Sequence, residues 1–84
     1  MITANHEIFY NNYKIQITFI DKQPNFLQIL ICNPNIDHGF VYLIPFDQNE
    51  IDINNSSAIE QYVINHPQFI ISFNSAVEKF PYVQ

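Results

Sequence analysis

The alternation of apolar and polar residues is clearest on either side of Asn11 and Asn12. A two-residue hairpin loop needs positive φ at both positions, which asparagine tolerates better than any residue except glycine. Pairing outward from such a loop fixes the register of the two strands. The expected pairs are Tyr10 with Tyr13, Phe9 with Lys14, Ile8 with Ile15, Glu7 with Gln16 and His6 with Ile17. One face of this hairpin is apolar and the other is polar, which is typical of a sheet with one face in water.

Two later segments, residues 26–32 and 40–44, predict strands that are apolar on both faces. A turn cluster at residues 21–25 precedes the first segment, and a loop at residues 33–39 separates the two. A strand with two apolar faces is usually central in its sheet or covered on both sides. We therefore expect both segments in the middle of the sheet, or else an interface on their second face.

A polar, acidic loop follows, and then a helix is predicted. Ser57 and Glu60 have the spacing of a capping box, in which the serine oxygen and the glutamate each satisfy a backbone amide. A helix of about nine residues should follow and should end before Pro67, since proline is not tolerated in a helix interior.

The segment at residues 68–73 is compatible with two structures. Its apolar residues alternate as in a strand, yet a helical stripe is also compatible with the sequence, formed by Phe69, Phe73, Ala76, Val77 and Phe80. Because Phe-Ile-Ile-Ser-Phe is a poor helix former, we expect a strand here. A second capping box, from Ser75 to Glu78, would then begin a short helix.

These elements predict an α+β fold. We expect an antiparallel four- or five-stranded sheet that begins with the N-terminal hairpin or meander, and one or two short helices in the C-terminal half. The chain of 84 residues has room for one core, so residues 1–84 are expected to form a single domain. The sequence has 48% apolar residues, including eight Phe and five Tyr, which are enough large side chains to fill that core.

Charge narrows the classes of partner. The formal net charge is −5, with three lysines and no arginine. Nucleic-acid binding and binding to an anionic membrane both need cationic side chains, so neither is expected. Attraction to a basic protein surface is favoured instead.

The sequence also bears on the compartment. Cys32 is the single cysteine, so no internal disulfide can form. The first residues lack the basic and apolar regions of a signal peptide, and the longest apolar run, residues 40–44, is far shorter than the roughly 20 residues that span a bilayer. We expect a cytoplasmic protein.

No catalytic, cofactor-binding or metal-binding residues are assigned from the sequence. Possible metal ligands occur, but their spacing matches no recognised site. These residues are His6, Cys32, Asp37, His38 and His66. Cys32 belongs to an apolar segment, where a thiol is expected to be inert, and one glycine is too few for a phosphate-binding loop. We expect neither an enzyme nor a bound cofactor.

Two groups of residues are candidates for contact with a partner. Asp47, Glu50 and Asp52 form either a solvated loop or an electrostatic contact for a basic partner. The aromatic residues either fill the core and sheet edges or supply stiff contact area at an interface. The aromatic candidates are Tyr10, Tyr13, Phe40, Tyr42 and the tail at residues 80–83.

The leading functional hypothesis is a small acidic protein that binds and inhibits a larger macromolecule by covering its functional surface. In composition alone, the chain is similar to toxin-immunity proteins and to anti-CRISPR proteins, which are also small and acidic. The alternative is a homo-oligomeric structural or regulatory module, in which the second apolar face of residues 26–32 and 40–44 pairs with its copy as a homodimer.

Overall fold

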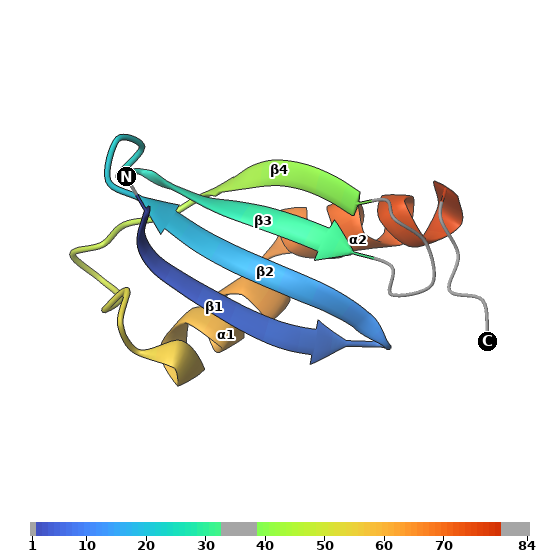
Figure 1. The fold of residues 1–84 in the computed structure, drawn as a ribbon, viewed down its shortest axis with the longest axis horizontal. Coiled ribbons are helices and arrows are strands. Elements are labelled where there is room, and N and C mark those ends of the chain that lie inside the picture. The colour runs from blue at the N-terminus through green and yellow to red at the C-terminus, as the bar shows by residue number, and fades with distance from the viewer. Residues whose placement is uncertain (1, 33–38, 80–84) are drawn as a thin grey trace.

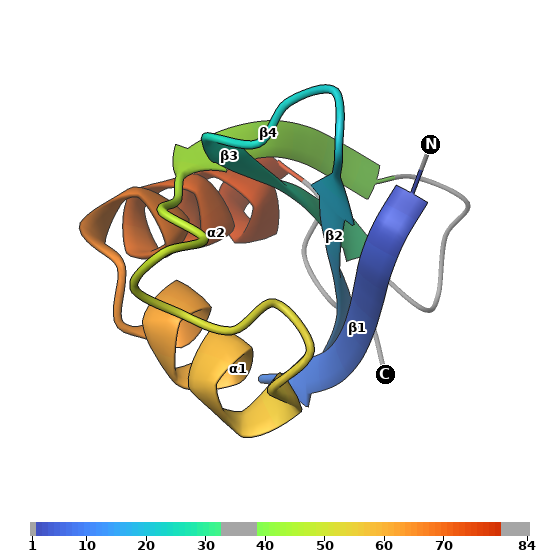
Figure 2. The same ribbon diagram turned by 90° about the vertical axis from the view of Figure 1, so that its left-hand side faces the viewer.

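A computed structural model of the chain describes residues 2–32 and 39–79, with side chains from residue 4 onward. Four strands within these residues form one antiparallel sheet in the order β1-β2-β3-β4, and two helices follow. The strands are β1 (Ile2–Tyr10), β2 (Tyr13–Ile20), β3 (Phe26–Cys32) and β4 (Gly39–Pro45), and the helices are α1 (Ser56–Ile64) and α2 (Pro67–Lys79). Both helices lie on the same side of a curved sheet (Figures 1 and 2). The predicted α+β class is confirmed.

The β1–β2 hairpin has the predicted loop and register. Asn11 and Asn12 both have positive φ, 49° and 73°, as a two-residue loop requires. All five expected pairs, from Tyr10 with Tyr13 to His6 with Ile17, are present. Alternate residues of β2, beginning with Tyr13, are buried, so the side predicted to be apolar faces the core.

The third and fourth strands differ from the expectation in one respect. β3 lies between β2 and β4, as predicted for an interior strand. β4 pairs with β3 in unbroken register, from Gly39 opposite Cys32 to Pro45 opposite Phe26, and it has no further strand beside it among the described residues. The prediction of a central position was therefore wrong for β4, since the strand expected at residues 68–73 is a helix. The alternative expectation, an interface on the second face, stays a prediction.

The first helix begins earlier than predicted. Asn55 is its N-cap, and the Asn55 side-chain oxygen accepts a hydrogen bond from the backbone N–H of Ala58 at 3.1 Å. The capping box expected at Ser57 was wrong, because Asn55 takes that role two residues upstream. At the other end the backbone N–H of Asn65 donates to the carbonyl of Gln61, so the helix ends before Pro67, as expected.

The strand expected at residues 68–73 was wrong, since these residues lie within α2. Pro67 is the first helical residue, a position where its missing N–H is not needed. Phe69, Phe73 and Ala76 lie on one helical stripe and are buried. Burial of this stripe outweighs the low helix propensity of the segment. Ser75 is consequently inside the helix, and no second helix starts there.

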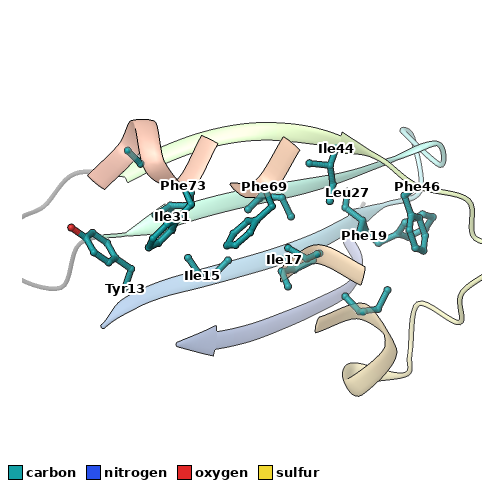
Figure 3. Packing of buried hydrophobic residues seen from close by; sticks show 14 residues of the cluster. Tyr13, Ile15, Ile17, Phe19, Leu27, Ile31, Ile44, Phe46, Phe69 and Phe73 are labelled. Atoms are coloured by element: carbon teal, nitrogen blue, oxygen red, sulfur yellow. The ribbon is translucent and has the colours of Figure 1, made fainter. Parts of the chain in front are cut away.

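The core fills the space between the inner face of the sheet and the helices (Figure 3). Phe69 is fully buried, with its ring 5.4 Å from that of Tyr10 and 5.7 Å from that of Phe73. The other buried residues come from all parts of this layer: Tyr13, Ile15, Ile17, Phe19, Leu27, Ile29, Ile31, Ile44, Phe46, Ile59, Val63, Phe73 and Ala76. The helices thus cover one side of the sheet, and its other side faces solvent.

Candidate binding surfaces

The loop at residues 46–55 carries the three predicted acidic residues, and we call it the acidic loop. It begins at Phe46, which is buried and whose backbone N–H donates to the carbonyl of Asn25 at 2.9 Å. Asp47 and Asp52 each accept a hydrogen bond, at 2.9 Å, from the backbone N–H two residues further on. Figure 2 shows the loop running from the end of β4 to the start of α1, on the side of the sheet that the helices cover. The structure therefore gives the loop a defined shape and leaves its carboxylates exposed.

The acidic loop is attached to the body of the protein from two sides. Ile51 and Ile53 are half-buried and pack against the core. On β1, the Nε2–H of His6 donates to the carbonyl of Ile53 at 2.7 Å, and Nδ1 of the same ring lies 3.1 Å from the Ser56 hydroxyl. With Nε2 protonated, the Ser56 hydroxyl donates to Nδ1 in the neutral ring. His6, which the sequence offered as a metal ligand, has a structural role here.

Glu50 also influences a neighbouring aromatic residue. The pKa of the Tyr62 phenol is raised, first by desolvation and then by the negative charge of Glu50. The Tyr62 hydroxyl donates to the backbone carbonyl of Pro45, and the Tyr62 ring packs edge-on to that of Phe46, 5.9 Å away. Glu50 therefore lies close enough to the Tyr62 phenol for its charge to act on it.

The charge is divided unevenly over the described part of the chain. In residues 39–79, five acids accompany one lysine: Asp47, Glu50, Asp52, Glu60 and Glu78, with Lys79. In residues 2–32 the charges balance, with Glu7 and Asp21 against Lys14 and Lys22. The loop and helix layer consequently holds the negative charge, and the first three strands are neutral.

The aromatic candidates lie apart from the acidic loop. Tyr13 is 3% exposed and is part of the core. This agrees with the interpretation that the aromatic residues fill the core, and not with contact to a partner. Tyr10 is half-buried, with its ring 4.9 Å from that of Phe73. In Figure 3, Tyr13 and Phe46 lie at opposite ends of the core cluster, so the hairpin tip and the start of the acidic loop are far apart.

The two aromatic candidates on β4 also point toward the helix layer, as the burial of Ile44 on the same side of the strand shows. The ammonium group of Lys79 lies 5.6 Å from the centre of the Phe40 ring. The Tyr42 hydroxyl is buried and has no hydrogen-bond partner among the described residues, and burial raises the pKa of this phenol. The remaining aromatic candidates, at residues 80–83, lie outside the described residues.

The open face, defined as the side of the sheet away from the helices, is a second surface. Phe9 is 72% exposed there, and Val41 is 61% exposed. The register places Val41 opposite Leu30, so apolar side chains concentrate on β3 and β4. We call this group the apolar patch, and its members are Phe26, Leu30, Cys32, Val41 and Leu43. The sequence indicated a second apolar face on these segments, whereas Phe9, on a strand with a polar outer side, was missed.

The polar half of the open face belongs to β1 and β2. Lys14 and Glu7 form an ion pair there, with 3.4 Å between Nζ and a carboxylate oxygen. Gln16 donates to the same Glu7 carboxylate, and Thr18 donates to Asn5 across the strands. The open face therefore has a charge-balanced polar half beside an apolar half.

Reactive side chains do not gather at either surface. In the ranges 4–32 and 39–79, no group of three or more His, Cys, Asp and Glu residues is close enough to hold a metal ion. His66 accepts a hydrogen bond from the backbone N–H of Gln68 at 3.1 Å, and Cys32 is a half-buried free thiol on the open face. Asp37 and His38 lie outside the described residues.

No protein-family model, curated protein or solved structure matches the chain at a significant level. Neither described helix is both long and apolar enough to cross a membrane.

Proposed function

We propose that this chain is a small acidic protein that binds a larger macromolecule and inhibits it by covering a functional surface rich in basic groups. The acidic loop makes the contact. The observation that supports this most directly is that Asp47, Glu50 and Asp52 lie exposed on a loop with a defined shape, in the part of the described chain that holds the net negative charge.

The loop is suited to binding because little order has to be imposed on it. Ordering a flexible loop at an interface costs about 0.5–1.5 kcal/mol for each immobilised side chain. Here Phe46 at one end and His6 at the other attach the loop before any partner arrives. The Asp47 and Asp52 side chains are held as well, by the backbone N–H groups of residues 49 and 54, so binding has less order to impose on this loop.

The three carboxylates are also available to a partner. None of them forms an ion pair with a lysine among the described residues. An acidic surface speeds encounter with a basic one and can occupy lysine and arginine sites that otherwise bind nucleic acid. A standard interface takes about 800 Å² per partner, roughly a seventh of the 5288 Å² accessible surface of this chain.

The test removes the three charges without disturbing the loop. In the variant Asp47→Asn, Glu50→Gln, Asp52→Asn, the asparagine side chains keep the oxygens that accept from residues 49 and 54. The matched control is Asp21→Asn, Glu60→Gln, Glu78→Gln, which removes the same charge elsewhere and leaves the Glu7–Lys14 pair intact. Tagged wild type and both variants are used to capture partners from lysate of the host or of its competitors, with quantification by mass spectrometry.

We expect wild type and the control to retain one partner at stoichiometric levels, and the loop variant to bind it about 3–150-fold more weakly, since three exposed charge pairs contribute about 0.6–3 kcal/mol together. Equal loss in both variants would show that total charge, and not the loop, matters. Retention by the loop variant, or the absence of any stoichiometric partner, would contradict the proposal.

A further inference from the structure

We propose that the open face of the sheet is a homodimer interface, in which the apolar patch of one copy packs against the same patch of a second copy. This inference does not depend on the proposed function, because it concerns the opposite side of the molecule from the acidic loop and can be tested on the isolated protein.

The patch is contiguous because of the strand register. Leu30 and Val41 are direct cross-strand neighbours, and Leu43 lies two pairs further along β4 on the same face, opposite Gln28. Val41 and Leu43 are 61% and 41% exposed, so this apolar area is open to water in the single chain. An exposed apolar group of this kind, beside a polar half, is typical of a protein interface.

The edge next to this patch lacks the usual protection against association. β4 contains no charged residue and pairs with β3 without a bulge. The other edge strand, β1, has a register shift between Ile2 and Ala4 and carries the charged residue Glu7. Charges and bulges on edge strands discourage unwanted pairing. Pairing along the β4 edge is therefore the competing mode of association, and the thiol measurement below distinguishes it from packing of the two open faces.

Charge indicates a second copy as that partner. The open face carries the Glu7–Lys14 pair and is neutral, so it neither selects a basic partner nor repels itself. When two sheets pack face to face about 10 Å apart, the helix layers, each about 10 Å thick, lie on the outside. The two acidic loops are then separated by much more than the roughly 8 Å over which charges interact at physiological salt.

The size of the face predicts a weak dimer. Four strands spaced about 4.8 Å apart and seven residues long, at about 3.4 Å per residue, offer roughly 450 Å² in projection. Two such faces bury about 1,000 Å², which is the lower end for a specific interface. We therefore expect a dissociation constant on the order of 10 µM.

Analytical ultracentrifugation from about 1 µM to about 1 mM, around the expected dissociation constant, measures the association directly. Cys32 provides an independent measurement, since its thiol lies on the open face of an interior strand. In a face-to-face dimer, its alkylation by iodoacetamide should slow roughly tenfold at the highest concentration, because little monomer remains. Pairing along the β4 edge alone would leave this thiol accessible.

The variant Val41→Glu should abolish the dimer, and Ile71→Glu is the matched control. The two side chains are 61% and 64% exposed, but Ile71 lies on α2, on the other side of the molecule. Circular dichroism and thermal unfolding show whether each variant is folded, and the milder Val41→Thr should weaken the dimer at least tenfold if the glutamate variant fails to fold.

The proposal is overturned if wild type remains a monomer at about 1 mM, a hundred times the expected dissociation constant. A dimer whose Cys32 reacts at an unchanged rate overturns it as well. The proposal is also overturned if Ile71→Glu disrupts the dimer as much as the Val41 variants do. None of these results bears on the capture experiment, which tests the acidic loop.

Discussion

The attachment of the acidic loop through His6 can be tested by a double-mutant cycle with Ser56. His6 contacts the carbonyl of Ile53 at 2.7 Å and the Ser56 hydroxyl at 3.1 Å. Each hydrogen bond contributes about 1 kcal/mol net, so His6→Ala should lower the free energy of unfolding by about 2 kcal/mol. This is a substantial part of the roughly 4–12 kcal/mol expected for a chain of this length.

Ser56→Ala removes only the second hydrogen bond. It should cost up to about 1 kcal/mol, less a small gain because alanine is the better helix former. The cycle cancels that gain and should return a coupling of about 1 kcal/mol between the two residues. Urea unfolding followed by circular dichroism measures all four proteins, with m expected to be unchanged.

Amide hydrogen exchange provides the local measurement. In the wild-type structure the amides of Asn49 and Asn54 donate hydrogen bonds within the loop. In His6→Ala these two amides should exchange faster, while the exchange of amides in β2 and β3 should change only as far as the global stability changes. A His6→Ala cost below about 0.5 kcal/mol together with a coupling near zero would refute the claim that these contacts hold the loop.

Three further predictions concern the fold. Asn12→Gly should stabilise the hairpin by about 0.5 kcal/mol and Asn12→Val should destabilise it by about 1–2 kcal/mol, because φ is 73° at this position; equal unfolding midpoints for the two variants would contradict the assigned turn. Tyr42→Phe should raise the free energy of unfolding by about 1 kcal/mol at neutral pH, since it removes a buried hydroxyl without a described partner. The folded-state pKa of Tyr42 is raised above its usual 10.0, so wild type should lose further stability as the pH rises above 10, whereas the Phe variant should not lose this contribution. A difference in unfolding free energy between the two proteins that fails to grow above pH 10, measured by urea unfolding, would contradict this prediction. Phe69→Leu should cost about 1–2 kcal/mol and Phe69→Ala about 3–5 kcal/mol in thermal or urea unfolding, because this ring is fully buried in the core; a cost for Phe69→Ala below 1 kcal/mol would place the side chain outside the core.

The hairpin could be predicted from the sequence because its constraints are local. Two consecutive asparagines fix the loop, and a period of two then fixes which side of each strand is buried. The same period correctly indicated that β3 and β4 have a second apolar side. It could not indicate whether that side is covered, because this depends on where the helices pack, several tens of residues away.

The second helix shows where local preference fails. Its residues have low helix propensity, which favours a strand when the sequence is considered alone. In the structure, Phe69, Phe73 and Ala76 reach the core only because they share a helical stripe. Tertiary burial decided the outcome, and the loss of an expected strand placed β4 at an edge.

The acidic loop was recognised from its composition alone. Its shape was not predictable, since it depends on His6, which is 47 residues from Ile53 and 50 from Ser56 in the sequence. Residue type alone makes the tyrosines of the hairpin candidates for an interface. The distance between the hairpin tip and the acidic loop, in contrast, follows from the fold.

The salt dependence of partner binding shows whether the acidic loop makes the contact. Isothermal titration of the captured partner with wild-type protein, at salt concentrations from about 50 mM to about 500 mM, should show affinity falling steeply as the charges are screened. The loop variant, lacking the charges of Asp47, Glu50 and Asp52, should bind weakly and with little dependence on salt. An affinity for wild type that is unchanged across this range would contradict a contact made through the acidic loop.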